Sequence, residues 1–143
     1  MDGLLEQLLD DITNLFENNT EYSDMVVKEI YDIFPDISYP LTTIQEIENS
    51  DNARFFDETE RVTNLTYQFT INAEQTLNKT AIQNVREIAK IIDNYLKGPK
   101  YRCLRRIGAL IIVPTSGDDN VMQGHLRYNC CLEKDTNTIY RRY

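Results

Sequence analysis

The sequence lacks most of the residues on which catalytic and metal sites are built. It has no tryptophan, one histidine and three cysteines among 143 residues. The lone His125 completes no Ser/His/Asp triad, although a nucleophilic cysteine beside it stays open as an alternative. The three cysteines, Cys103, Cys130 and Cys131, lack the Cys-x₂-Cys spacing of zinc sites, and the five glycines are scattered instead of forming a phosphate-binding loop. We therefore predict no catalytic residue, no metal and no cofactor, and a protein that is not an enzyme.

Long hydrophobic runs are also missing. The longest apolar stretch is 109–113, whereas a membrane-spanning helix needs about 20 apolar residues. The first residues are acidic, whereas a secretory signal begins with positive charge. We expect no membrane association and a protein that stays in the compartment where it is made, with its thiols reduced.

Basic residues are scarce in the first part of the chain. Residues 1–60 hold 16 acidic and 2 basic residues, and residues 61–143 hold 7 acidic and 13 basic residues, which gives −14 and +6 and sums to the net charge of −8. This split is compatible with an ordinary solvated surface, and it also predicts two unlike surfaces that attract each other between copies or partners.

Hydrophobic periodicity predicts three helices. Residues 3–17 and 79–97 each carry an apolar stripe at three- and four-residue spacing. Asn78 or Thr80 could cap the second of these helices, and Gly98-Pro99 ends it. A further helix is expected over 23–34, between Ser23 as N-cap and Pro35.

Alternating and β-branched segments predict the strands. The clearest runs over 61–71, where Leu65, Tyr67, Phe69 and Ile71 share one face, which we expect to pack against Ile82, Val85, Ile88 and Ile92. Other strands are expected over 39–47, over 101–113 with a kink near Gly108, over 121–133 and over 138–142, with a polar loop over 49–60 and a turn over 114–120.

Together these elements predict one α+β domain over residues 1–143. The expected architecture is a sandwich of an antiparallel or mixed β-sheet with the helices packed on one face, in the order α-α-β-β-α-β-β-β. Its closing strands are expected to leave exposed sheet edges, which favour assembly with other chains.

Two segments are candidate contact sites. The first is the aromatic pair Phe55-Phe56 with Arg54 and Asp57 in a charged loop, where the two rings either pack on the core or form an interaction tip. The second is the aromatic-basic C-terminus with Tyr140, Arg141 and Arg142, which could form an edge strand that presents its arginines, as Arg127 does from the preceding strand.

Most of the chain resembles the tail terminator (tail-completion) proteins of long-tailed bacteriophages. The resemblance rests on the N-terminal helix, on the strand Tyr39-Pro40-Leu41-Thr42-Thr43-Ile44 with its charged loop, on the strand 65–71 leading to a helix that ends at Gly98, and on the closing segments Leu126-Arg127-Tyr128 and Thr138-Ile139-Tyr140-Arg141. The expected helix 23–34 departs from the simplest form of this pattern.

The resemblance implies a structural virion protein of the phage tail or neck, assembled in the host cytoplasm. It implies a homohexameric ring that caps the tail tube protein, ends tail polymerisation and offers a docking surface to the head–tail connector protein, while DNA passes through the lumen without specific binding. Alternatives are another head–tail joining or neck protein, and a small nucleic-acid-binding module that uses Arg102, Arg105, Arg106, Arg127, Arg141 and Arg142.

Overall fold

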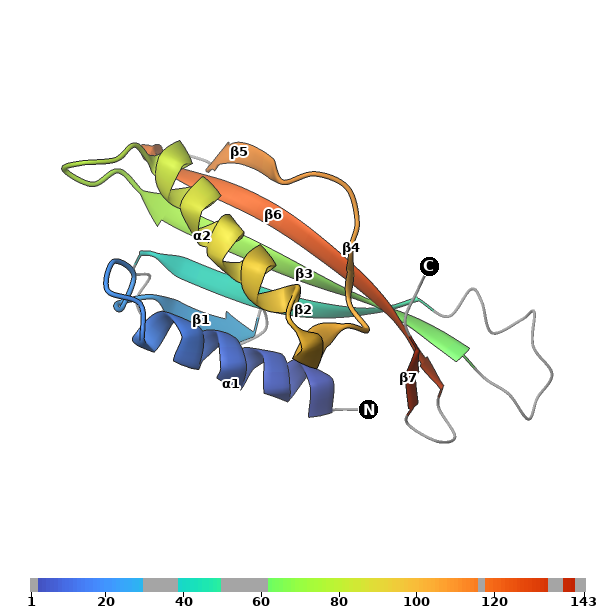
Figure 1. Cartoon of the computed structure of the whole chain (residues 1–143). Coiled ribbons are helices and arrows are strands. Elements are labelled where there is room, and N and C mark those ends of the chain that lie inside the picture. The colour runs from blue at the N-terminus through green and yellow to red at the C-terminus, as the bar shows by residue number, and fades with distance from the viewer. Residues whose placement is uncertain (1–2, 30–38, 50–61, 116–117, 134–137, 141–143) are drawn as a thin grey trace.

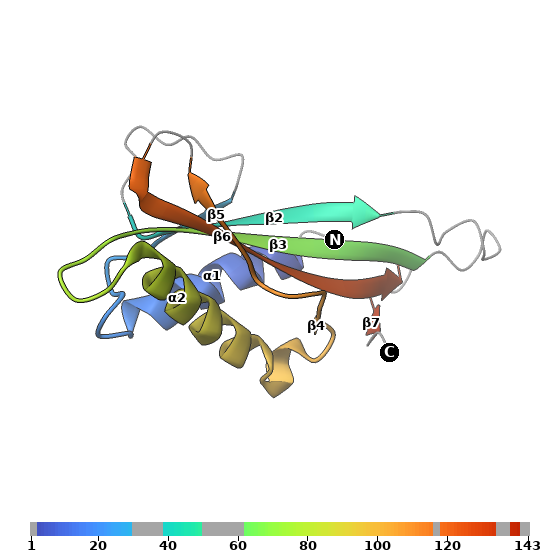
Figure 2. The same cartoon turned by 90° about the horizontal axis from the view of Figure 1, so that it is seen from above.

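The computed structural model describes residues 3–29, 39–49, 62–115, 118–133 and 138–140. It is an α+β fold in which one mixed sheet carries both described α-helices on the same face (Figures 1 and 2). The helices are α1 (Gly3–Glu17) and α2 (Ala81–Leu96), followed by the short 3-10 helix η2 (Pro99–Tyr101). The predicted fold class is thereby confirmed.

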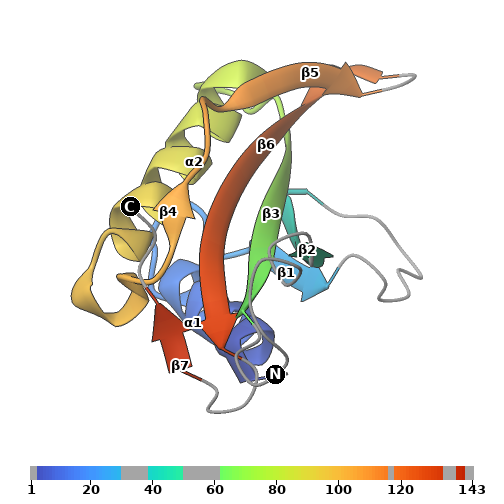
Figure 3. The same ribbon diagram turned by 90° about the vertical axis from the view of Figure 1, so that its right-hand side faces the viewer.

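The sheet is built around two long strands. β3 (Val62–Glu74) pairs antiparallel with β2 (Leu41–Asn49) on one side and with β6 (Asp118–Glu133) on the other. β1 (Val26–Glu29) adds a parallel edge beside β2. The short strands β5 (Ile111–Thr115), β4 (Arg105–Arg106) and β7 (Thr138–Tyr140) follow one another along the outer edge of β6, as Figure 3 shows.

The core lies between the sheet and the two helices. Leu8, Ile12 and Phe16 of α1 are buried, because their three- and four-residue spacing places them on one side of that helix. The expected packing of β3 on α2 is confirmed for most of its members. The strand residues Leu65, Tyr67, Phe69 and Ile71 and the helix residues Val85, Ile88 and Ile92 all lie in one buried cluster, whereas Ile82 is half-buried at its margin.

Local signals set the ends of α2. The Thr80 hydroxyl accepts a hydrogen bond from the backbone N–H of Gln83, and the Gln83 side chain accepts one from the backbone N–H of Thr80. This reciprocal pair is a capping box, which satisfies two backbone donors that the first helical turn leaves free. At the other end, Gly98-Pro99 stops the helix as expected.

The predicted helix over 23–34 is wrong for the part that the structure describes. Val26–Glu29 is instead a strand, parallel to β2 in the register Val26↔Leu41 to Glu29↔Ile44. Residues 30–38 lie outside the described residues. The two β-branched residues Val26 and Val27 suit a strand, and pairing with β2 satisfies backbone groups that one isolated helical turn would leave free.

The single kinked strand predicted over 101–113 is also wrong. The chain forms the end of η2, then β4 and then β5, and each of these two strands pairs with its own stretch of β6. The interruption falls near Gly108, as expected, where a φ of 69° suits a residue without a Cβ. The predicted turn over 114–120 is shorter in the structure, because β5 reaches Thr115 and β6 begins at Asp118.

Candidate interaction surface

The face of the sheet opposite the two helices is predominantly polar in the described residues, and we call it the open face. Successive side chains of a strand point to opposite faces of the sheet. The residues between the buried ones therefore lie on the open face, and the register fixes which of them are neighbours. In β3 and β6 the opposed pairs on this face are Thr66↔Asn129, Gln68↔Arg127, Thr70↔His125 and Asn72↔Gln123. The β3 residues of these pairs alternate along the strand with the buried residues Leu65, Tyr67, Phe69 and Ile71.

A chain of hydrogen bonds joins these side chains around His125. Its Nδ1 lies 3.3 Å from the Thr70 hydroxyl and 3.4 Å from Gln68 Nε2, and its Nε2 lies 3.1 Å from Gln123 Oε1. Gln123 Oε1 can only accept, so Nε2 carries the proton and Nδ1 accepts. Burial, and then the positive charge of Arg127, lower the pKa of His125. His125 is therefore neutral at pH 7.

Arg127 ends this hydrogen-bonded row. Its Nε donates to Gln68 Oε1 at 2.9 Å, and its side chain is otherwise exposed. Arg127 and His125 line a groove of about 450 Å³ together with Gln68 and the segment from β4 into β5. The connection contributes Ile107, Gly108 and Ala109, and β5 contributes Ile111. The groove thus combines a fixed positive charge with apolar walls.

Exposed apolar side chains gather beside this groove. Ile107 is 46% exposed and Ile111 is 61% exposed. Val113 is 36% exposed, and its register partner Gln123 places it on the open face as well. Isolated exposed apolar residues are ordinary, but a cluster next to ordered polar groups is typical of a protein-binding surface.

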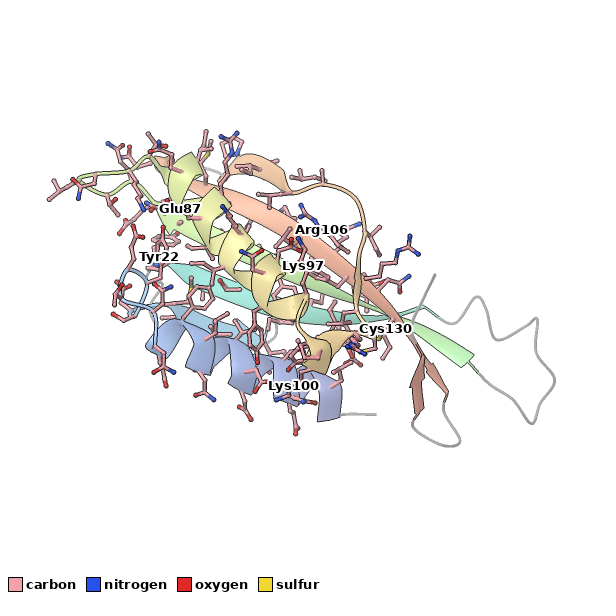
Figure 4. The ribbon with its side chains drawn as sticks, viewed as in Figure 1. Tyr22, Glu87, Lys97, Lys100, Arg106 and Cys130 are labelled. Atoms are coloured by element: carbon pink, nitrogen blue, oxygen red, sulfur yellow. The ribbon has the colours of Figure 1, made fainter. Side chains whose placement is uncertain are left out.

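A second feature lies where α2 ends. A hollow of about 310 Å³ is lined by four basic residues, with Asp93, Tyr128 and three other residues completing its wall; we call it the basic hollow. The basic residues are Lys97, Arg102, Arg105 and Arg106. Figure 4 shows Lys97 and Arg106 next to each other at this end of α2.

Among the described residues that line the basic hollow, Asp93 is the only acidic one. Its Oδ1 accepts a hydrogen bond from the Tyr128 hydroxyl at 2.7 Å, and its Oδ2 lies 3.1 Å from Lys97 Nζ and 3.4 Å from Arg106 Nη1. Burial by itself would raise the pKa of Asp93, but the Tyr128 hydrogen bond and the two cations outweigh burial and hold the pKa below its ordinary value. Asp93 therefore stays ionised and links α2 to β6 and β4.

Replacing Asp93 by asparagine is expected to reduce stability in a pH-dependent way. The lowered pKa means that the ionised carboxylate stabilises the fold fully above its ordinary pKa of about 3.9, and that this contribution is lost as the pH falls further through the folded value. We expect Asp93→Asn to cost about 1–2 kcal/mol at pH 7, since a hydrogen bond to a charged group is exchanged for a neutral one.

The measurement is urea unfolding between pH 7 and pH 2. In Asp93→Asn the free energy of unfolding should fall less steeply as the pH is lowered. Some acid dependence should remain, because the pKa values of Asp11 and Glu87 are also lowered. The control is Asp10→Asn, at an exposed position on α1. A variant whose stability follows the wild-type pH curve would contradict the role given to Asp93.

A third cluster joins the connection between α1 and β1 to α2 and to the residues just before it. The Tyr22 hydroxyl donates to Glu87 Oε2 at 2.7 Å and lies 3.0 Å from Asn84 Oδ1, and Lys79 pairs with both Glu21 and Glu87. Figure 4 shows Tyr22 and Glu87 together at this junction. These contacts lie within the chain and hold the segment that follows α1 against the first turns of α2.

The residues proposed from the sequence as contact sites are only partly described. Arg127 lies on the open face, in the groove. Tyr140 is placed by its backbone in β7, opposite Cys131. Arg54, Phe55, Phe56, Asp57, Arg141 and Arg142 lie outside the described residues. Sequence reasoning missed Gln68 and Ile111 as surface partners of Arg127, since only the strand register brings them together.

Metal binding and membrane insertion each require a particular arrangement of side chains. Within the described residues, no three histidine, cysteine, aspartate or glutamate side chains are grouped so that they could hold a metal ion. No helix in this part of the chain has both the length and the apolar character needed to cross a membrane.

The fold defines the chain as an α+β protein with both described helices on one face of a mixed sheet. Comparison with protein-family models and with curated protein sequences finds no match.

Proposed function

We propose that this chain is a structural subunit that works by binding copies of itself and other proteins, and not by catalysis. More particularly, we propose that it is a tail terminator (tail-completion) protein of a long-tailed bacteriophage. In this proposal six copies form a ring that caps the tail tube, ends its polymerisation and receives the head–tail connector. The particular assignment rests on the sequence resemblance.

The open face is the observation that supports an assembly role most strongly. Its polar side chains are held by one another around neutral His125, so they lose little conformational freedom when a partner covers them. Ile107 and Ile111 stand exposed at its groove and supply apolar area for a contact. The unequal charge of the two parts of the chain favours a head-to-tail ring, which needs two different surfaces on each copy.

The experiment is deletion of the gene in the phage that encodes this chain, followed by complementation. Deletion is expected to give tails of abnormal length that do not join heads, as seen by electron microscopy of negatively stained particles. Normal tails joined to heads after deletion would contradict the tail-terminator proposal.

Complementation by a surface variant tests the open face. Ile111→Lys is expected to fold, because substitutions at exposed positions change stability by about 0.5 kcal/mol or less, and to fail to restore infectivity. The matched control is Leu77→Lys, which changes a fully exposed leucine in the connection between β3 and α2 and should complement. Equal complementation by the two variants would mean that the contact does not include Ile111.

A further inference from the structure

One side of α1 carries an acidic row that no basic side chain among the described residues neutralises. Glu6, Asp10 and Glu17 are exposed, and we call them the acidic stripe. At 3.6 residues per turn these three residues lie within about 40° of one another, on the side of α1 opposite buried Leu8 and Ile12. None of the three forms an ion pair with a described residue.

The basic hollow carries more positive than negative charge. The segment 97–106 contains five basic residues and no acidic one. Asp93 pairs with Lys97 and Arg106, and Asp11 pairs with Lys100 at 2.7 Å. Arg102 and Arg105 are exposed and form no ion pair with a described residue, so the hollow keeps an excess of positive charge.

The acidic stripe and the basic hollow of one chain do not meet at the contact between α1 and the segment 97–106. Lys100 reaches α1 at Asp11, which lies about 100° around the helix from Asp10. The acidic stripe therefore lies on a different side of α1 from the contact with Lys100, and its exposed carboxylates are accessible to another molecule.

From these observations we infer that the basic hollow of one copy binds the acidic stripe of the next copy. Carboxylates of the stripe enter the hollow and meet Arg102 and Arg105, whose planar guanidinium groups suit bidentate contact with carboxylates. A second copy is a better occupant than nucleic acid, since the chain carries a net charge of −8 and its exposed acidic stripe repels phosphate. This inference rests on the proposed self-assembly and assigns it an interface.

The test uses two variants of the full chain that reverse one surface each. The first is Arg102→Glu with Arg105→Glu, and the second is Glu6→Lys with Asp10→Lys and Glu17→Lys. All five residues are exposed, so both variants are expected to fold, which circular dichroism melting checks. The control is Arg86→Glu with Lys90→Glu, two exposed cations on α2 that belong neither to the acidic stripe nor to the lining of the basic hollow.

Sedimentation equilibrium at low and high salt measures the association. The wild type and the control are expected to self-associate at low salt, and each reversed variant alone should associate at least about tenfold more weakly. An equimolar mixture of the two reversed variants should recover association, because each now offers the surface that the other needs. Added salt should weaken wild-type association, since the charges involved are exposed.

The same variants are tested in the phage, so that the inference is decided even if the free chain is monomeric. Neither reversed variant should complement the gene deletion alone, and their co-expression should. Reversed variants that associate and complement as the wild type does would overturn this interface while leaving the assembly function standing. A deletion without a tail defect would overturn the proposed function itself.

The basic hollow could instead bind nucleic acid, and fluorescence anisotropy with a labelled DNA duplex detects this. The nucleic-acid alternative predicts salt-sensitive binding that only the Arg102→Glu, Arg105→Glu variant loses and that mixing does not restore. That result would overturn the inference.

Discussion

Replacing Phe69 by alanine is expected to lower the free energy of unfolding by about 3–5 kcal/mol, since this is the usual cost of deleting a fully buried phenylalanine ring. Phe69 lies at the centre of β3 and has no exposed surface. Its ring packs edge-on against Tyr128 of β6, with the centroids 5.6 Å apart and the planes at 84°. The loss therefore combines the apolar area of the ring, the cavity that it leaves and the aromatic contact.

Thermal and urea unfolding measure this effect, and a fall in the melting temperature of about 10 °C or more is expected. The control is Gln68→Ala, one position earlier on the open face, which should cost less than about 1 kcal/mol because the side chain is only partly buried. Equal losses from the two substitutions would contradict the assignment of the two sheet faces.

Replacing Gly124 by alanine is expected to destabilise the fold by about 1–3 kcal/mol, although glycine-to-alanine changes in strands often stabilise. A Cβ at this position would lie 2.5 Å from Val85 Cγ1 and 3.3 Å from Leu110 Cδ1. Val85 is fully buried on α2, so it cannot move aside without disturbing the core. The steric cost exceeds the entropic gain of about 0.4–1 kcal/mol that alanine brings through the unfolded state.

A double-mutant cycle with Val85→Ala identifies the cause. Val85→Ala alone should cost about 2 kcal/mol, and the double variant should lose clearly less than the sum of the two single losses, with a coupling of about 1 kcal/mol or more. Gly108→Ala is the comparison, because its φ of 69° makes alanine unfavourable although no atom lies within 4 Å of the added Cβ. Val85→Ala should not reduce the stability loss caused by Gly108→Ala. If the losses from Gly124→Ala and Val85→Ala simply added, the steric explanation would be contradicted.

The strands and helices that the sequence predicted well are those whose signals are local. The alternation over 65–71 and the apolar stripe over 82–96 identify β3, α2 and the faces that they bury. Thr80 and Gly98-Pro99 mark the ends of α2 because capping depends on neighbours within one turn. The clustering of Arg102, Arg105 and Arg106 was also visible in the sequence.

Other features depended on partners distant in sequence. Val26–Glu29 was expected to be helical, and it is a strand because β2 offers it a parallel edge. The segment 101–113 was expected to be one strand, and it is divided because Arg105-Arg106 and Ile111–Thr115 each pair with a different stretch of β6. No local pattern specifies which edge a short segment will meet.

For the open face, too, some features follow from the sequence and others only from the tertiary structure. The sequence by itself determined that His125 and Arg127 lie on the polar side of their strand, since side chains alternate along any extended backbone. Only the tertiary structure decided that Thr70 lies opposite His125 and that Gln68 lies opposite Arg127. It also decided that Ile107 and Ile111 complete the groove. The physical reason is that strand register is set by burial of the opposite face against α1 and α2, and this burial joins residues far apart in the chain.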